Sequence, residues 1–225
     1  MDGNSLNSQQ TQPAASKPKA GRRKQAERTA DSRKRIIDAT IRCLHRLGYN
    51  ALTISIVAKD AGVSRGLLAY HFDNKADLMV AVREAIQAEE KALLEAIRGK
   101  VTPLEYLKQL PRYTASGMRR KQAIAVTEIL LASRSDSELM KKLRAYERAL
   151  DLEAIENVRA SFEEVGIEPP ANLPAVVRTT VAAIRGLAIS ELVLGDKSET
   201  DASVDHLIEL MSPLIPLQDF DEGKK

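Results

Sequence analysis

The chain has 225 residues, a net charge of +3, one cysteine and no tryptophan. A chain of this length buries roughly 70% of the surface that its unfolded form exposes, so its fold needs no structural metal. Cys43 cannot form an intramolecular disulfide, which favours a reducing compartment. The polar opening shows no secretory signal and no run approaches 18 apolar residues, so we expect a cytoplasmic protein without a membrane span.

The composition predicts an all-α fold. The sequence is rich in Ala, Leu, Ile, Arg, Lys and Glu, and it contains only 3 Phe and 5 Tyr. This usage favours helices over sheets. No alternation of apolar and polar residues indicates a strand of any length.

Positive charge is concentrated near the N-terminus. Residues 17–35 hold nine Lys or Arg and two acidic residues, a net charge of 9 − 2 = +7. Residues 1–16 carry only Asp2, so residues 36–225 sum to 3 − 7 + 1 = −3. Such a segment neutralises phosphates when it lies beside DNA. A merely solvated, solubilising tail explains the same charge equally well.

The first predicted helix follows a polar arm. Residues 1–28 are poor in apolar side chains, so we expect them to be disordered. Thr29 or Asp31 is suited to cap a helix that ends at Gly48. Its apolar stripe comprises Ile37, Ile41 and Leu44, with Ile36, Thr40, Cys43 and Leu47 beside it. Cys43 is therefore expected in the core, and His45 on the surface.

The next stretch predicts a helix-turn-helix over residues 53–72. Thr53 is suited to cap one helix, Gly62 supplies a left-handed turn residue, and Ser64 caps a helix over residues 65–72. Gly66 costs about 1 kcal/mol relative to Ala inside a helix. Its presence suggests that a phosphate or base edge approaches the backbone there. The second helix of such a motif can enter a DNA major groove.

Six further helices are predicted from apolar periodicity and from Gly and Pro boundaries. The breaks fall at residues 99–103, 116–119, 133–136, 166–173 and 195–200. The helices are expected over residues 75–98, 103–116, 119–133, 136–166, 174–194 and 201–211.

Residues 33–80 carry an ordered series of motifs. A basic lead-in precedes IIDAT, a Gly-Tyr turn, T-three-residues-VA, AGVS-R-G, YHF and K-two-residues-L, the last at Lys75 and Leu78. The series resembles the tetracycline-repressor (TetR) family of bacterial transcriptional regulators. The first 90 residues are similar to the branch that represses choline-to-betaine genes. A choline cage uses several aromatic side chains, and the aromatic-poor C-terminal region does not predict one.

The resemblance implies a sequence-specific regulator, most commonly a repressor, that binds a palindromic double-stranded DNA operator as a homodimer and is released by a small-molecule effector. It implies a DNA-binding domain at residues 29–90, an effector-binding and dimerisation domain at 91–215, and a tail at 216–225. The implied DNA contacts are Thr53, Ser64, Arg65, Gly66, Leu67, Ala69, Tyr70, His71 and Lys75. Arg65 is the best candidate to contact a base edge, because a guanidinium bonds guanine O6 and N7 together. Many members have an aromatic residue where this chain has Ala69.

Three of these residues also have a purely structural interpretation. Tyr70 is suited to pack across the next helix, and His71 to cap a helix or bond a core carbonyl. Lys75 is also explained as an exposed lysine in the first turn of its helix. Leu68 and Phe72 are expected in the core. The candidate effector-pocket residues are Tyr106, Tyr113, Met118, Glu128, Arg134 and Phe162. The candidate dimer-interface residues, in a bundle of the last two helices of each subunit, are Ala182, Ala183, Gly186, Ala188, Leu207 and Met211.

No catalytic or metal-binding constellation is evident in the sequence. His45, His71 and His206 fall on different predicted helices without ligand spacing, and no Gly-rich phosphate loop is present. We therefore expect no enzyme activity, cofactor or metal. Two alternatives remain: a DNA-compacting protein without sequence preference, and an all-α ligand-binding protein or enzyme.

Overall fold

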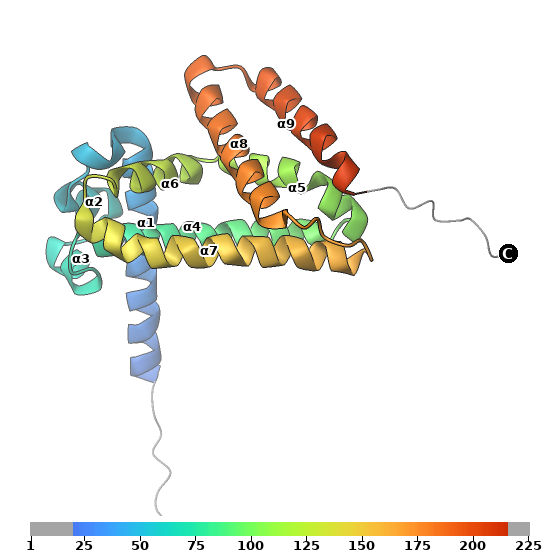
Figure 1. Cartoon of the computed structure of the whole chain (residues 1–225). Helices are drawn as coiled ribbons and strands as arrows, with labels where there is room; N and C mark the ends of the chain where they lie inside the picture. Colours follow the sequence, from blue (N-terminus) through green and yellow to red (C-terminus); the bar gives the residue numbers. More distant parts are fainter. Residues whose placement is uncertain (1–19, 216–225) are drawn as a thin grey trace, which may run out of the picture.

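The computed structural model describes residues 20–215, and this part of the chain is all-α, as predicted (Figure 1). A 3-10 turn, Ser212–Leu214, follows the last helix. The nine helices are α1 Ala20–Ala51, α2 Ile54–Ala61, α3 Arg65–His71, α4 Lys75–Arg98, α5 Pro103–Met118, α6 Lys121–Ala132, α7 Ser137–Glu164, α8 Leu173–Leu194 and α9 Lys197–Met211. None of these helices is long and apolar enough to cross a membrane.

The predicted helices are all present, and the largest differences lie in α1. Helix α1 begins at Ala20, nine residues before Thr29, so the end of the arm predicted to be disordered is helical. The remainder of that arm and the predicted tail lie outside the described residues. The helical geometry is interrupted at Gly48, the predicted stop, where φ is 70° and ψ 175°; a short continuation to Ala51 follows across this kink. The other ends differ from prediction by four residues at most, the largest difference being at the start of α9.

The largest hydrophobic cluster joins the N-terminal helices to α6 and α7. It combines buried side chains of α1 to α4 with Ala125, Ile129, Leu139 and Leu143. Cys43, Leu68 and Phe72 belong to this cluster, and His45 is exposed, as predicted. Leu47 is 37% exposed, so the predicted stripe of α1 ends at Leu44. The helix-turn-helix therefore shares one core with the helices that connect it to the rest of the molecule.

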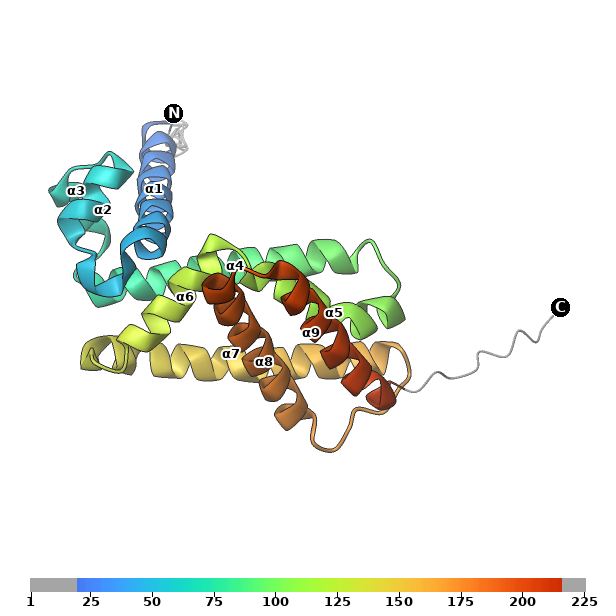
Figure 2. The ribbon, with the colours of Figure 1, turned by 90° about the horizontal axis from the view of Figure 1, so that it is seen from above.

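The C-terminal helices form a second body with two smaller clusters. One cluster lies between α5, α7 and α8, and the other between α5, α8 and α9. Helices α4 and α7 run side by side from the helix-turn-helix into this body, and α8 and α9 pack on α5 (Figures 1 and 2). Helices α4 and α7 thus connect the two bodies physically.

Candidate DNA-contacting surface and ligand cavity

Capping side chains set the geometry of the helix-turn-helix. The Thr53 hydroxyl accepts a hydrogen bond from the Ile56 amide at 3.3 Å, and the Ser64 hydroxyl accepts one from the Leu67 amide at 3.1 Å. Both caps were predicted from sequence. Gly62, with φ 63° and ψ 40°, ends α2 in the left-handed conformation, as predicted.

One face of α3 is open to solvent. Arg65, Gly66 and Ala69 are exposed, and Tyr70 is 74% exposed. Among the described residues, neither the Arg65 guanidinium nor the Tyr70 hydroxyl has a hydrogen-bond partner. A Cβ atom at Gly66 would meet only the Ser64 hydroxyl, at 3.9 Å. The chain itself therefore does not require glycine there. The opposite face of α3 buries Leu68, so the helix is held in place while this surface stays free.

His71 is engaged within the chain. Its Nε2 lies 2.7 Å from the hydroxyl of Ser32 on α1, and that hydroxyl donates to the Thr29 carbonyl at 2.9 Å. Because the single hydroxyl hydrogen is used there, we assign the imidazole Nε2–H as the donor to Ser32. Burial, and secondarily the nearby Arg33, lowers the pKa of His71. The neutral side chain thus fastens α3 to α1.

Lys75 is likewise engaged, with Tyr49. Its amine donates to the Tyr49 carbonyl at 2.7 Å and lies 3.7 Å from the centre of the Tyr49 ring. Burial lowers its pKa, and the carboxylate of Asp136 opposes that shift. The predicted phosphate contacts of His71 and Lys75 therefore compete with contacts inside the chain, which resemblance alone did not reveal.

Tyr49 connects three helices through all of its polar groups. Its amide donates to Glu128 of α6 at 2.8 Å, its hydroxyl donates to Asp136 at the start of α7 at 2.7 Å, and its carbonyl accepts from Lys75 of α4. Two hydrogen bonds, from the Leu139 amide and the Tyr49 hydroxyl, lower the pKa of Asp136. We call Tyr49, Lys75, Glu128 and Asp136 the Tyr49 joint. It is a polar contact between the helix-turn-helix body and the connecting helices, and a hydrogen bond from the Asn74 side-chain amide to Glu138 of α7 at 3.0 Å lies outside it.

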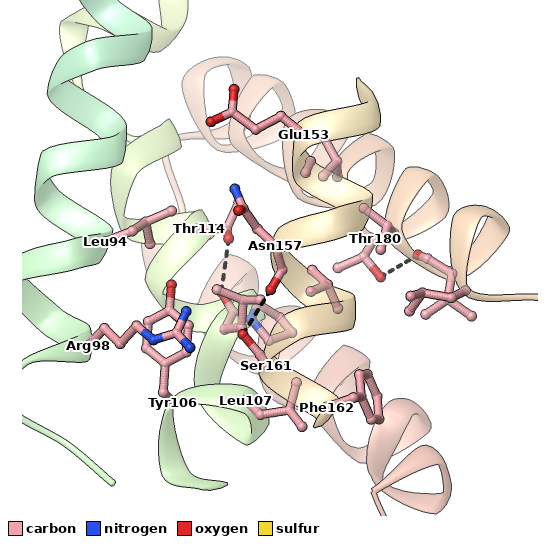
Figure 3. A pocket seen from close by; sticks show the side chains of 18 of the residues that line it. Leu94, Arg98, Tyr106, Leu107, Thr114, Glu153, Asn157, Ser161, Phe162 and Thr180 are labelled. Atoms are coloured by element: carbon pink, nitrogen blue, oxygen red, sulfur yellow. Dashed lines mark hydrogen bonds between the residues drawn. The ribbon is translucent and has the colours of Figure 1, made fainter. Parts of the chain in front are cut away.

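A cavity of about 290 Å³ lies between α4, α5, α7 and α8, with the end of α9 and the following turn also lining it. Residues three and four apart in a helix share one face. In α5 that face presents Tyr106, Leu110 and Thr114, and in α7 it presents Ala154, Val158 and Ser161. Figure 3 shows Tyr106, Thr114 and Ser161 in the cavity wall. Most of the wall is aliphatic. The cavity lies at the far end of α4 and α7 from the Tyr49 joint.

The structure separates the predicted pocket residues. Tyr106 and Phe162 line this cavity, and Tyr113 stacks on Tyr106 with ring centres 5.9 Å apart without lining the cavity. Met118 and Glu128 line a second cavity of about 260 Å³ between α4, α6 and α8, while Arg134 is exposed and lines neither. Five polar residues of the lining, Arg98, Thr114, Asn157, Ser161 and Thr180, were not predicted from the sequence. They lie on four helices, and only Asn157 and Ser161, four residues apart in α7, carried a signal in their spacing.

The predicted dimer residues also divide into two groups. Ala182 and Gly186 are exposed on α8, and a Cβ atom at Gly186 would meet nothing within 4 Å. Half-buried residues contact the chain's own interior: Leu207 packs against the α5–α8–α9 cluster, Met211 lines the large cavity and Ala188 the second one. Large exposed apolar side chains lie nearby on α8 and α9, namely Ile189, Leu192, Val193, Leu194 and Leu210.

Among the described residues, no group of His, Cys, Asp and Glu is placed to hold a metal ion.

Comparison with known proteins gives a clear result for the N-terminal region. Residues 36–82 match the model of the family described as bacterial regulatory proteins, tetR family. This match contains α2, α3, the second half of α1 and the first third of α4.

Two curated relatives extend the similarity to different degrees. The transcriptional regulator TtgR of Pseudomonas putida is 31% identical over 90 residues, which are 39% of this chain and 43% of TtgR. The matched segment thus spans less than half of that relative. The regulator BetI of Rhizobium meliloti is 25% identical over 175 residues, which are 76% of this chain and 83% of BetI. The similarity to BetI agrees with the resemblance seen in the first 90 residues.

A solved structure shows the same fold beyond the N-terminal region. The crystal structure of the transcriptional regulator FadR from Bacillus subtilis, in complex with stearoyl-CoA, superposes with a TM-score of 0.63. It is 21% identical in sequence and covers 79% of this chain and 96% of its own. The helix-turn-helix, the all-α body and the family match agree. The chain therefore carries, at residues 36–82, the DNA-binding domain of the TetR family of bacterial transcriptional regulators.

Proposed function

We propose that the protein is a homodimeric repressor that binds a palindromic operator in the bacterial cytoplasm and releases it when a small molecule fills the large cavity. The observation that carries this proposal is the open face of α3, where the polar groups of the Arg65 and Tyr70 side chains have no hydrogen-bond partner among the described residues. A buried opposite face fixes that surface in place. Such a free, rigid, partly basic helix face fits insertion into a DNA major groove.

The proposed contacts divide by chemistry. Arg65 is assigned to a base edge, where a guanidinium can bond guanine O6 and N7 together. Gly66 and Ala69 allow close approach, and Leu67 is half-buried at the edge of the surface. Thr53, Ser64 and Tyr70 are assigned to phosphates, which position the protein without reading sequence. We assign His71 and Lys75 to holding the domain together, because their polar groups already have partners.

The proposed dimer uses the outer faces of α8 and α9. Ile189 is 43% exposed, Val193 77% and Leu210 64%, and an exposed group of large apolar side chains commonly marks an interface. Ala182 and Gly186 lie on the same helix and permit close approach of a second helix. Two α3 helices then reach successive major grooves about 34 Å apart, or a multiple of that distance.

The proposed coupling runs through α4 and α7. Both helices line the cavity, and both reach the Tyr49 joint, through Lys75 and Asp136, respectively. A ligand that fits better when these helices are displaced would change the position of α3 relative to its counterpart in the dimer. Its effect is limited by its differential affinity for the two arrangements. FadR, which contains stearoyl-CoA, supports the idea that this fold can enclose a ligand.

Operator selection tests the proposal. The purified full chain is incubated with random duplexes, and enriched sequences are compared with bulk DNA at several salt concentrations. We expect one palindromic sequence to be enriched. Arg65→Ala should weaken its binding by at least about 30-fold, because each of the two subunits loses one bidentate base contact of about 1–3 kcal/mol.

The matched control is Arg134→Ala, which removes one exposed positive charge between α6 and α7. This variant should bind the operator with nearly the affinity of the wild type. Uniform binding to all duplexes with a steep salt dependence would instead indicate DNA compaction and reject the repressor.

A further inference from the structure

We infer that the large cavity selects an uncharged, mainly aliphatic molecule carrying one hydrogen-bond-accepting oxygen, and that the Tyr106 hydroxyl is the group that selects it. This inference rests on the proposed function, which makes the cavity the effector site. It follows from the size of the cavity and from which of its polar groups are still free to bond.

The cavity wall favours a compact aliphatic ligand. Leu94, Leu110, Val158, Val177 and Phe162 contribute apolar surface from four helices. A volume of about 290 Å³ is near the lower end of typical ligand pockets. Since one water occupies about 30 Å³ in the liquid, the space suits a ligand of roughly ten non-hydrogen atoms.

Three hydroxyl groups in the wall have no hydrogen to offer a ligand. Thr114 donates to the Leu110 carbonyl at 2.9 Å, Ser161 to the Asn157 carbonyl at 3.0 Å, and Thr180 to the Val176 carbonyl at 2.8 Å (Figure 3). A hydroxyl carries a single hydrogen. These groups can accept hydrogen bonds, but they do not supply a donor for an oxygen of the ligand.

The Tyr106 hydroxyl is different, and it is more deeply buried than the other neutral donors of the wall, the side-chain amides of Asn157 and Gln87, which are exposed and half-buried, respectively. The side chain is only 7% exposed, yet among the described residues the hydroxyl has no hydrogen-bond partner. Figure 3 shows the ring beside Arg98, with its oxygen at the inner end toward Thr114. Stacking on Tyr113 and the Arg98 guanidinium, 5.4 Å from the ring centre, hold this orientation. Burial raises the pKa of Tyr106, so the hydroxyl stays protonated and can donate.

Charged ligands are disfavoured by the ion pairs along one edge of the cavity. Lys91 pairs with Glu153 at 2.7 Å, and Arg98 pairs with Glu164. An anionic ligand would compete with these carboxylates and meet the exposed Glu95 on the same edge. A cationic ligand would compete with Lys91 and Arg98 for the same carboxylates. A charged head placed deeper would lose its hydration without a counter-ion. A neutral oxygen, such as a ketone or ester carbonyl, does not compete in these ion pairs and carries no charge that must lose its hydration.

Calorimetric titration of the full chain with ten-carbon probes tests the inference. The probes are 2-decanone, decanoate and decylamine, which share chain length but differ in charge. We expect 2-decanone to bind more tightly than the two charged probes. Tyr106→Phe should weaken 2-decanone binding about three- to tenfold, the loss expected for one neutral hydrogen bond.

Tyr113→Phe is the matched control, because Tyr113 belongs to the same stacked pair but does not line the cavity. It should leave the affinity for 2-decanone unchanged. Equal weakening in both variants, undiminished binding in Tyr106→Phe, or tighter binding of decanoate or decylamine would overturn the inference. Failure of every 2-alkanone from six to twelve carbons to bind would overturn it as well.

Operator binding is measured on the same preparations without probes, and it separates the inference from the proposed function. A chain that selects an operator but fails the probe series retains the repressor proposal and loses the ligand assignment. Conversely, Tyr106-dependent ketone binding without any operator preference upholds the ligand assignment and removes the repressor proposal.

Discussion

The two bodies of this molecule differ in how densely their side chains are packed. Of the twelve largest fully buried side chains, ten belong to the cluster that joins α1 to α4 with α6 and α7, and only Leu173 and Ile184 lie in α8. The C-terminal body instead surrounds its large cavity with half-buried aliphatic residues. The body that contains the helix-turn-helix is therefore the more densely packed one, and the proposed ligand would act on the less densely packed helices around the cavity.

The joint between the bodies is polar, which suits a contact that transmits a change. Tyr49 uses a backbone amide, a carbonyl and a hydroxyl to contact three helices, so its hydrogen bonds depend on the positions of all three. Apolar packing tolerates small sliding, whereas hydrogen bonds weaken steeply when their angles change. A displacement of α4 or α7 at the cavity is thus expected to act first on this joint.

The contrast in packing is tested most strongly by one substitution made in each body. Leu78→Ala, at a fully buried position of α4, should reduce the free energy of unfolding by about 2–5 kcal/mol, because it opens a void in a dense core. Leu94→Ala, further along the same helix, only enlarges a cavity that already exists. Urea unfolding should show a clearly smaller loss for it. Equal losses would mean that the C-terminal body is as densely packed as the N-terminal one.

The next largest loss in the free energy of unfolding is expected for a substitution at Gly48, the kink of α1. Gly48 has φ 70° and ψ 175°, a conformation nearly restricted to glycine, and an added Cβ would lie 3.1 Å from Glu128 Oε2. Gly48→Ala should cost about 1–3 kcal/mol for the conformation alone, and displacement of Glu128 adds to it. Gly62→Ala is the control: its φ of 63° is also unfavourable, but its Cβ meets nothing within 4 Å.

Thermal unfolding compares these two variants. We expect Gly62→Ala to lose about 1–2 kcal/mol, the cost of a left-handed residue. A loss for Gly48→Ala no greater than that of its control would show that Glu128 moves aside freely, and that the joint is looser than its distances suggest.

The fold was largely predictable because its signals are local. Caps at Thr53 and Ser64, the turn at Gly62 and the first turn of α5 at Pro103 each act within a few residues of the chain. The start of α1 was predicted too late, since a polar composition indicates the absence of a core but not of a helix. The first turns of α1 project beyond the body that the helix supports (Figure 1), and Gln25, Glu27 and Arg28 are exposed there.

The site was less predictable because it depends on contacts distant in sequence. His71 and Lys75 had suitable chemistry for phosphates, but their partners Ser32 and Tyr49 lie 39 and 26 residues away. Likewise Met118 and Phe162 were grouped as pocket residues, although the fold assigns them to different cavities. Periodicity identifies the inner face of a helix, but it does not identify which inner faces surround the same space.

A smaller loss in the free energy of unfolding is expected when the Tyr49 hydroxyl is removed from the Tyr49 joint. Tyr49→Phe removes the hydrogen bond to Asp136 and leaves the ring beneath Lys75 in place. We expect a loss of about 0.5–1.5 kcal/mol in the free energy of unfolding, the usual net value of one hydrogen bond. Tyr146→Phe is the control, since its hydroxyl has no hydrogen-bond partner among the described residues. An equal loss in both variants would show that the Asp136 contact adds nothing to the joint.

The smallest expected effect concerns pH and separates the two roles considered for His71. Its pKa is lowered in the folded chain, so the unfolded chain binds more protons just below pH 6.5. Stability contributed by this residue is therefore complete above pH 6.5 and is lost as the pH falls through the lowered pKa. The difference in unfolding free energy between wild type and His71→Gln should shrink over this range, when measured by urea titration.

The affinity for the operator should depend on pH in a different way from the free energy of unfolding. If His71 serves only to hold α3 against Ser32, wild type and His71→Gln will share one pH dependence of DNA binding while the domain stays folded. A phosphate beside the imidazole would instead favour its charged form, so wild-type affinity alone would rise on acidification. That rise would return His71 to the DNA-contacting surface, and its absence would leave the contact with DNA to the open face of α3.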